Sequence, residues 1–236
     1  MISPSDKEYR QTKQIMLGKE NLNPEFKPLA DFIDKTFGVR TINIVYDTID
    51  RGTRPRIGIY FEHYHEKQSF NENNGHVNFD SKKQKLIADK FKQSINEQGL
   101  IKNKRLFDLW TKSEKSKYQT DKILVYFSAF EPIAKNEANQ NITQDQIEQL
   151  KAELNCEDLW EISKCFSGTT FFLYTDEQVK SYENSETIKV WADKYFDILE
   201  TYNEFGYFKR EKFNILLDSK ENFDKNYESN WYYYYK

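Results

Sequence analysis

The fold is decided by a stretch near the end of the chain, SETIKVWADKYFDILETY at residues 185–202. Its large apolar residues recur at intervals of three and four positions, which is the spacing of one face of an α-helix. They are Ile188, Trp191, Tyr195, Ile198, Leu199 and Tyr202. An apolar run at residues 213–217 follows and ends at Asp218. Because this run is too short for a buried helix, it predicts a strand.

A fainter copy of the same stretch occurs earlier in the chain. Residues 85–91 read KLIADKF, and residues 189–195 read KVWADKY. The earlier copy also leads, after a longer polar gap, to an apolar run, at residues 123–127. Behind the two runs, residues 131–136 read EPIAKN and residues 221–226 read ENFDKN. The parallel predicts one structural unit that is used twice.

Capping signals and alternating residues complete the unit in both halves. A helix is expected from Asn23, which can cap it, to Gly38, and another is expected to begin at Asp80. In the second half, Thr143 and Gln146 have the spacing of a capping box at a helix start. The further predicted strands are residues 40–49, 57–64, 159–166 and 169–175. Both halves therefore read helix, strand, strand, helix, strand.

This order predicts an α+β fold of two tandem, divergent αββαβ units, each with a mainly antiparallel sheet packed against helices. The first unit is expected at residues 23–135 and the second at residues 141–236, with a polar connector between them. Residues 1–22 are polar and predict a peripheral N-terminal segment. Each half has an ordinary length for a small domain.

Composition and charge limit the classes of function. Aromatic residues make up 16% of the 236 residues, so aromatic rings are expected to build much of the core. The net charge of −3 argues against a general nucleic-acid binder, which needs a basic surface, and it fits a basic protein partner. The glycines are isolated, so no phosphate-binding loop is predicted and no cofactor is expected.

The ends and the apolar runs of the chain bear on its location. The first residues lack the apolar core of a signal peptide. No apolar run approaches the roughly 18 residues that cross a membrane as a helix, so no membrane contact is expected. The chain contains two cysteines, Cys156 and Cys165, fewer than a small secreted scaffold has. A reduced, cytoplasmic protein is therefore predicted.

Three features of the second half carry a family resemblance. They are the order of elements from Thr143 onward, the strand KFNILLD at residues 212–218, and the acidic and aromatic ending, ENFD at 221–224 and WYYYY at 231–235. With these features the second half resembles the YezG-like family of bacterial immunity proteins, which neutralise secreted toxins of interbacterial competition systems. The resemblance implies a binding protein rather than an enzyme. That family usually has a single unit, whereas a divergent first half precedes it here.

The ending supplies the candidate binding surface. Because aromatic residues favour strands, residues 231–235 predict a final strand with Trp231 and Tyr233 on one face. An exposed aromatic edge of this kind suits a protein interface, since Tyr and Trp are enriched at interface hot spots. Carboxylates beside it would favour a basic secreted toxin. The candidate partner-binding residues are Asp218, Glu221, Asp224, Glu228, Trp231 and Tyr233.

A histidine-rich segment offers an alternative. Residues 62–66 read EHYHE, and on a strand His63 and His65 point to the same face. Two imidazoles on one face can bind a metal if a carboxylate or His76 joins them. The alternative function is therefore a metal-dependent enzyme that uses this face. A second alternative is a regulatory or structural protein-interaction module.

Overall fold

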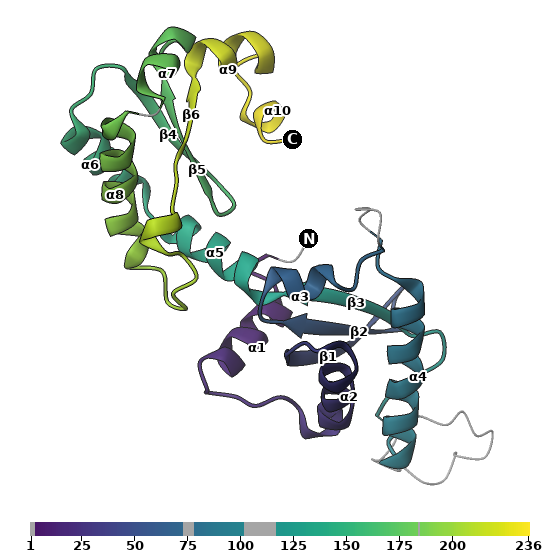
Figure 1. Cartoon of the computed structure of the whole chain (residues 1–236). Coiled ribbons are helices and arrows are strands. Elements are labelled where there is room, and N and C mark those ends of the chain that lie inside the picture. Colours follow the sequence, from purple (N-terminus) through teal and green to yellow (C-terminus); the bar gives the residue numbers. More distant parts are fainter. Residues whose placement is uncertain (1–2, 73–77, 102–116, 184) are drawn as a thin grey trace. The chain divides into compact units, whose positions relative to one another are not determined.

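The computed structural model describes residues 3–72, 78–101, 117–183 and 185–236. The chain divides into two compact units, Met1–Glu131 and Pro132–Lys236. Each unit contains one three-stranded sheet packed against helices (Figure 1). The predicted α+β class with two similar units is confirmed. Within the described ranges, no helix is both long and apolar enough to cross a membrane.

From Lys27 in the first unit and from Gln144 in the second, the α-helices and strands follow the same order. The first unit contains α1 (Lys7–Met16), the 3-10 helix η1 (Pro24–Phe26), α2 (Lys27–Phe37), β1 (Thr41–Ile49), β2 (Arg54–Phe61), α3 (Tyr64–Gln68), α4 (Ser81–Glu97) and β3 (Leu124–Ala129). α5 (Phe130–Asn141) continues from β3 across the unit boundary. The second unit contains α6 (Gln144–Leu154), β4 (Leu159–Cys165), β5 (Gly168–Leu173), α7 (Asp176–Tyr182), α8 (Glu186–Glu200), η2 (Arg210–Lys212), β6 (Leu216–Ser219), α9 (Lys220–Tyr227) and α10 (Trp231–Tyr234).

The two sheets have the same topology. The first has the order β1-β2-β3 and the second the order β4-β5-β6. In each, the first two strands form an antiparallel hairpin and the third strand joins in parallel. The third strand is parallel because two helices return the chain to the end where the second strand began. The expectation of a mainly antiparallel sheet therefore holds for the hairpins only.

Irregularities of the backbone also recur at equivalent places. The hairpin register shifts between Thr41 and Asn43 in the first unit and between Leu159 and Glu161 in the second. Both shifts lie at the start of the first strand of the hairpin, where they bend it. Two units with the same order of elements need not have a bulge at the same position. The shared bulges therefore show a closer structural similarity between the units than the order of elements does.

One main-chain hydrogen bond is repeated as well. In the first unit the Glu131 N–H donates to the Glu62 carbonyl at 2.9 Å. In the second the Glu221 N–H donates to the Tyr174 carbonyl at 3.2 Å. Each donor lies just after the third strand, and each acceptor lies just after the second. The bond fixes how the chain leaves the sheet, so the two units are similar beyond the strands themselves.

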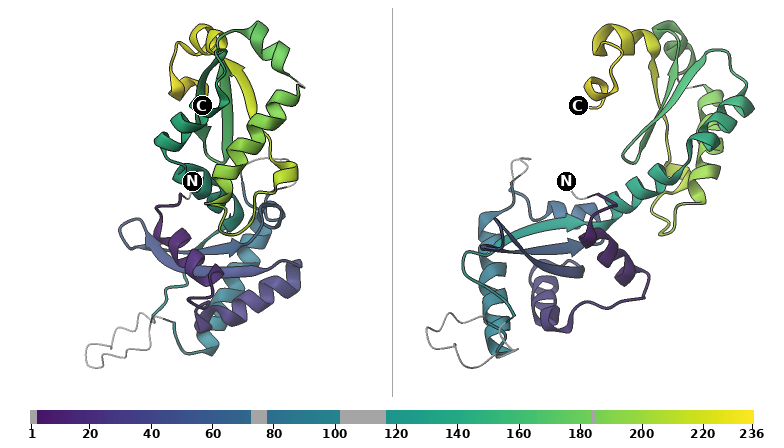
Figure 2. Two further views of the ribbon diagram at one scale, coloured as in Figure 1. Left: turned by 90° about the vertical axis from the view of Figure 1, so that its left-hand side faces the viewer. Right: turned by 180° about the vertical axis from the view of Figure 1, so that it is seen from behind.

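A pair of helices covers one face of each sheet. In the first unit α2 and α4 lie side by side on this face, and in the second α6 and α8 do so (Figure 1 and Figure 2). The core of the first unit includes Leu29, Ile33, Ile57, Ile59, Phe61, Ile87, Phe91 and Phe127. The core of the second includes Ile147, Leu150, Ile162, Phe171, Leu173, Trp191, Tyr195 and Leu199. The helical members of both cores belong to the apolar stripes that predict the helices from the sequence, and the other members lie on the strands.

The first helix, α1, packs on β1, and this corrects the prediction that residues 1–22 are peripheral. The Tyr9 side chain is fully buried, and its ring stacks on Phe130 with centroids 5.2 Å apart. The buried Thr12 hydroxyl accepts a hydrogen bond from Asn43 Nδ2 at 3.0 Å. A polar residue such as Thr12 gives no apolar signal in the sequence, which is why the buried face of α1 is hard to predict.

We expect Tyr9→Ala to lower the free energy of unfolding by about 3 kcal/mol or more, since a fully buried ring is removed and a cavity remains. Denaturant titration followed by circular dichroism measures the change. The matched control is Arg10→Ala, which removes an exposed side chain from the same helix and should change stability by less than about 0.5 kcal/mol. Equal, small effects of both variants would show that α1 is peripheral after all.

The predicted polar connector is the helix α5, and the boundary between the units lies after Glu131 instead of near residue 135. Pro132 does not prevent this helix, because a proline in the first turn removes no hydrogen bond that the helix needs. Ala134, Ala138 and Asn139 are buried. Small and polar residues such as these resemble a linker in the sequence, although they belong to a packed helix.

Candidate functional site

The histidine-rich segment at residues 62–66 does not form the predicted strand. β2 ends at Phe61, and α3 begins at Tyr64, so the segment turns from a strand into a helix. The His63 and His65 rings stack on each other, with centroids 5.5 Å apart. His63 Nδ1 lies 3.0 Å from Glu131 Oε2, and the Glu66 carboxylate accepts the His63 N–H at 2.8 Å.

These contacts support helix capping rather than metal binding. In the second unit the Thr175 N–H donates to the Gln178 side chain at 2.9 Å at the start of α7, which is the equivalent of the contact between His63 and Glu66. Glu62 is engaged by Arg40, whose Nη1 lies 2.9 Å from its Oε2. Among the residues described, no group of three or more His, Cys, Asp or Glu is placed to hold a metal ion. His76 lies outside the described residues.

The C-terminal residues form a second layer on the sheet of the second unit. Phe171 faces the core under α8, so its neighbour Phe172 faces the opposite side of the sheet. α9 and α10, yellow in Figure 1, pack on that side. Trp231 stacks on Trp160, with centroids 6.0 Å apart and planes 8° apart. The Trp231 and Phe223 ring centroids lie 4.2 Å apart, so the aromatic ending completes a layer of rings.

Residues 231–235 are predicted as a strand, but they form the short helix α10 and one residue beyond it. After α9, Glu228 and Ser229 have left-handed φ angles of 54° and 53°, which turn the chain back. The Asn230 side chain then accepts the Tyr232 N–H at 2.9 Å and caps α10. Tertiary packing of the rings on the sheet overrides their preference for strands.

The predicted acidic contact residue Asp218 is used inside the unit. Its carboxylate accepts hydrogen bonds from the Tyr234 hydroxyl at 2.6 Å and from Asn222 Nδ2 at 2.9 Å. It also accepts the Ser219 N–H at 2.7 Å. Burial, with this carboxylate beside it, raises the pKa of Tyr234. Asp218 therefore holds α9 and α10 in place, and its oxygens are not available to a partner.

Two further predicted carboxylates also have internal partners. Glu221 accepts the Asp176 N–H at the start of α7, at 3.2 Å. Asp224 forms an ion pair with Lys220 and accepts a hydrogen bond from the Ser229 hydroxyl at 2.6 Å. The contact with Lys220, followed by that with Ser229, lowers the pKa of Asp224. Glu228 is exposed, at the turn between α9 and α10.

Besides Glu228, a pair of adjacent tyrosines remains accessible. Tyr232 is 68% exposed and Tyr233 is 47% exposed, compared with 37% for Trp231. Their rings lie 5.9 Å apart. We call Tyr232 and Tyr233 the tyrosine surface. Of the six residues predicted to bind a partner, Tyr233 belongs to it, Glu228 lies close in sequence, and the other four are engaged in internal contacts.

Tyr232 is missing from the predicted set, since a strand would place it on the face opposite Tyr233. The sequence contains a signal for the helix in Asn230, a residue type that often caps helices. When the sequence is read alone, the strand preference of the five aromatic residues that follow outweighs this capping signal.

Comparisons with protein-family models, with curated proteins and with solved structures found no match to this chain. The resemblance of the second half to the YezG-like family therefore stays a prediction.

Proposed function

We propose that this chain is a binding protein of the immunity type, which neutralises a secreted bacterial toxin by covering part of its surface. The observation that supports the proposal is the tyrosine surface on α10. Tyrosine provides a large contact area at a low cost in conformational entropy, and it is enriched among the residues that dominate interface energies.

The residues that flank this surface are anchored by hydrogen bonds and ring stacking, which favours binding because little order has to be gained on association. The Tyr234 hydroxyl donates to Asp218, and the Tyr235 hydroxyl donates to Ser163 at 2.6 Å. The stack of Trp231 on Trp160 adds a third anchor. Tyr232 and Tyr233 are thus held between anchored residues, while their own rings face solvent.

Charge makes a smaller contribution than the sequence suggests. α9 carries Lys220 and Lys225 as well as Glu221 and Asp224, so its charges balance. A basic toxin remains the proposed partner because the whole chain has a net charge of −3. In this proposal the rings supply the affinity and the overall charge speeds the encounter. The proposal places the protein in the cytoplasm, where Cys156 and Cys165 stay free thiols.

The test is affinity purification of the tagged protein from its native cells, with mass spectrometry of what co-purifies. We expect one stoichiometric partner with the domain architecture of a secreted toxin. Tyr232→Ala with Tyr233→Ala should lose this partner, and with purified components it should weaken binding by at least about 30-fold, the effect of one hot-spot residue.

The matched control is Tyr64→Ala, which removes a tyrosine of similar exposure (49%) from the first unit. It should retain the partner. If the double variant binds the toxin as tightly as the unchanged protein, the tyrosine surface is not the binding site. A regulatory protein as the stoichiometric partner would support the alternative of a regulatory interaction module instead.

A further inference from the structure

The same groove occurs in both units. In the first unit it runs between α4 and the segment that enters β3, and in the second between α8 and the segment that enters β6. The volumes are about 400 Å³ and about 490 Å³. Nothing in the element order requires such a groove, so its recurrence is a property of the repeated unit.

The lining residues correspond position by position. The helix positions are Gln84 and Ile188, Lys85 and Lys189, Ala88 and Ala192, Asp89 and Asp193, and Lys92 and Phe196. The strand positions are Ile123 and Phe213, Leu124 and Asn214, and Val125 and Ile215. An alanine in the middle of each helix leaves room, and apolar side chains of the strand segment form part of the wall.

Each groove lies beside the open edge of a sheet. In the sheets that the structure describes, β3 and β6 have a neighbouring strand on one side only. The Val125 carbonyl on β3 accepts a hydrogen bond from Gln84 Nε2 of α4 at 2.6 Å, so a strand that pairs at this carbonyl has to displace the Gln84 side chain. Leu216, on β6, is 63% exposed. An open edge with an exposed apolar residue is a place where another strand can pair.

The helices beside the two grooves have opposite charge. α4 carries five lysines against Asp89 and Glu97, a net charge of +3. α8 carries Glu186, Asp193, Asp197 and Glu200 against two lysines, a net charge of −2. The helices that flank the two grooves therefore differ in the sign of their net charge.

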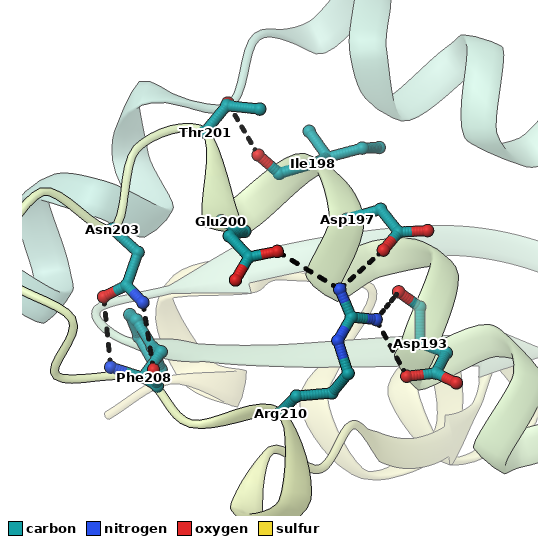
Figure 3. A network of polar contacts seen from close by, with 8 residues as sticks. All are labelled: Asp193, Asp197, Ile198, Glu200, Thr201, Asn203, Phe208 and Arg210. Carbon is teal, nitrogen blue, oxygen red and sulfur yellow. Dashed lines mark hydrogen bonds and ion pairs between the residues drawn. The ribbon is translucent and has the colours of Figure 1, made fainter.

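Arg210 bridges three carboxylates on α8 (Figure 3). Its Nη1 lies 2.9 Å from Asp193 Oδ1, and its Nη2 lies 2.7 Å from Asp197 Oδ1 and 3.3 Å from Glu200 Oε2. The guanidinium stands 4.5 Å above the Phe196 ring. One cation thus faces three carboxylates of α8.

We propose that the occupant of these grooves is a second copy of this chain, with β3 of one copy pairing with β6 of the other. In this arrangement the basic α4 of one copy lies against the acidic α8 of the other. The strand edges that pair, β3 and β6, each lie beside a groove of the same construction. The contact joins the first unit of one copy to the second unit of another, which is a head-to-tail contact. Two copies form a closed dimer if both of their contacts can be made at once, and longer chains of copies form if they cannot. The inference does not depend on the proposed toxin binding.

Sedimentation velocity on the full chain tests the proposal. The chain is used at about 100 µM, because this concentration detects contacts of micromolar affinity. We expect dimers or larger species at about 0.01 M salt and a shift toward monomer at about 1 M salt, where the Debye length falls to about 3 Å. Lys82→Glu with Lys85→Glu reverses α4 and should weaken association at least about 10-fold.

The complementary variant combines Glu186→Lys with Asp197→Asn, which leaves Asp193 and Glu200 to hold Arg210. It should also be monomeric, and the chain with all four substitutions should associate again, because both charges are then exchanged. Circular dichroism confirms that each variant is folded.

The charge-matched control is Lys35→Glu with Arg54→Glu, two exposed residues on α2 and β2. It should associate like the unchanged chain. The proposal is overturned if the unchanged chain is monomeric at low salt. It is also overturned if the two reversals leave association intact, or if the chain with all four substitutions stays monomeric while folded.

Discussion

Replacing Asn139 by aspartate is expected to lower the free energy of unfolding by about 4 kcal/mol at pH 8, because a buried amide donor is exchanged for a buried charge. Asn139 lies in α5 and is 1% exposed. Its Nδ2 donates to the Phe166 carbonyl and to the Gly168 carbonyl, both at 3.0 Å. These two bonds fasten the turn of the hairpin β4–β5 to α5.

The oxygen of the same amide is equally engaged. Asn139 Oδ1 accepts the Tyr195 hydroxyl at 2.7 Å and lies 3.4 Å from the Thr169 hydroxyl. An aspartate can keep these two acceptor bonds, but it has no N–H for the two carbonyls. Its charge would therefore face two carbonyl oxygens in a buried site, which is the reason for the large effect.

The pH dependence follows from the sign of the pKa shift. Burial disfavours the charged carboxylate, so the pKa of the introduced Asp side chain rises above that of an exposed aspartate. Stability is then lost at high pH and partly recovered as the pH falls through the raised pKa, because the neutral acid can donate one hydrogen bond. Denaturant titrations of the full chain at about pH 5 and about pH 8 measure the free energy of unfolding at the two pH values, and their difference tests the expectation.

The matched control is Asn141→Asp, at an exposed position near the end of the same helix. It should cost less than about 1 kcal/mol, the scale of an unfavourable charge at a helix C-terminus. An effect of the same small size for Asn139→Asp would show that the buried amide does not hold the hairpin.

Gly58→Ala is expected to lower the free energy of unfolding by about 3 kcal/mol through overpacking. A Cβ atom at Gly58 would lie 2.3 Å from Cζ and from the hydroxyl oxygen of Tyr126, which is closer than atoms can approach. The tyrosine cannot move freely, because its hydroxyl is hydrogen bonded to the Tyr60 hydroxyl at 2.9 Å. Arg56 also stands 5.0 Å above its ring.

The second unit indicates how to relieve this clash. Gly58 pairs with Tyr126 in the first sheet, and Thr170 pairs with Leu216 at the equivalent place in the second. The double variant Gly58→Ala with Tyr126→Leu should therefore be more stable than Gly58→Ala alone by at least about 1 kcal/mol. A double-mutant cycle from denaturant titrations measures this coupling. Strict additivity of the two single effects would contradict the steric explanation.

Local signals in the sequence predict most of the helices and strands. The Asp80 carboxylate caps α4 through the Lys82 and Lys83 N–H groups, and Thr143 with Gln146 forms the capping box of α6, as the spacing indicates. Gly38 ends α2 with a φ of 66°. These features depend on residues within a few positions of one another, so the sequence contains the information.

The wrong predictions concern segments whose structure depends on distant residues. The ending at residues 231–235 becomes helical because Trp160 and Phe172 offer it a surface of rings. The candidate carboxylate Asp218 turns inward because Tyr234 comes back to meet it. Such contacts join residues that are far apart in the chain, and periodicity does not report them. The order of the long helices and of the strands could be predicted, and so could the exposed Tyr233, but Tyr232 and the helix α10 that carries both tyrosines could not.

The helix α5 has a consequence for how the two units can be separated. It begins with Phe130, which is buried in the first unit, and reaches Asn139, which is buried in the second. Proteases cut preferentially at exposed loop tips. The junction between these units is a helix instead, so a protease would have to unwind it first. Limited digestion therefore gives no natural boundary here, and fragments of either unit have to be designed with α5 kept whole.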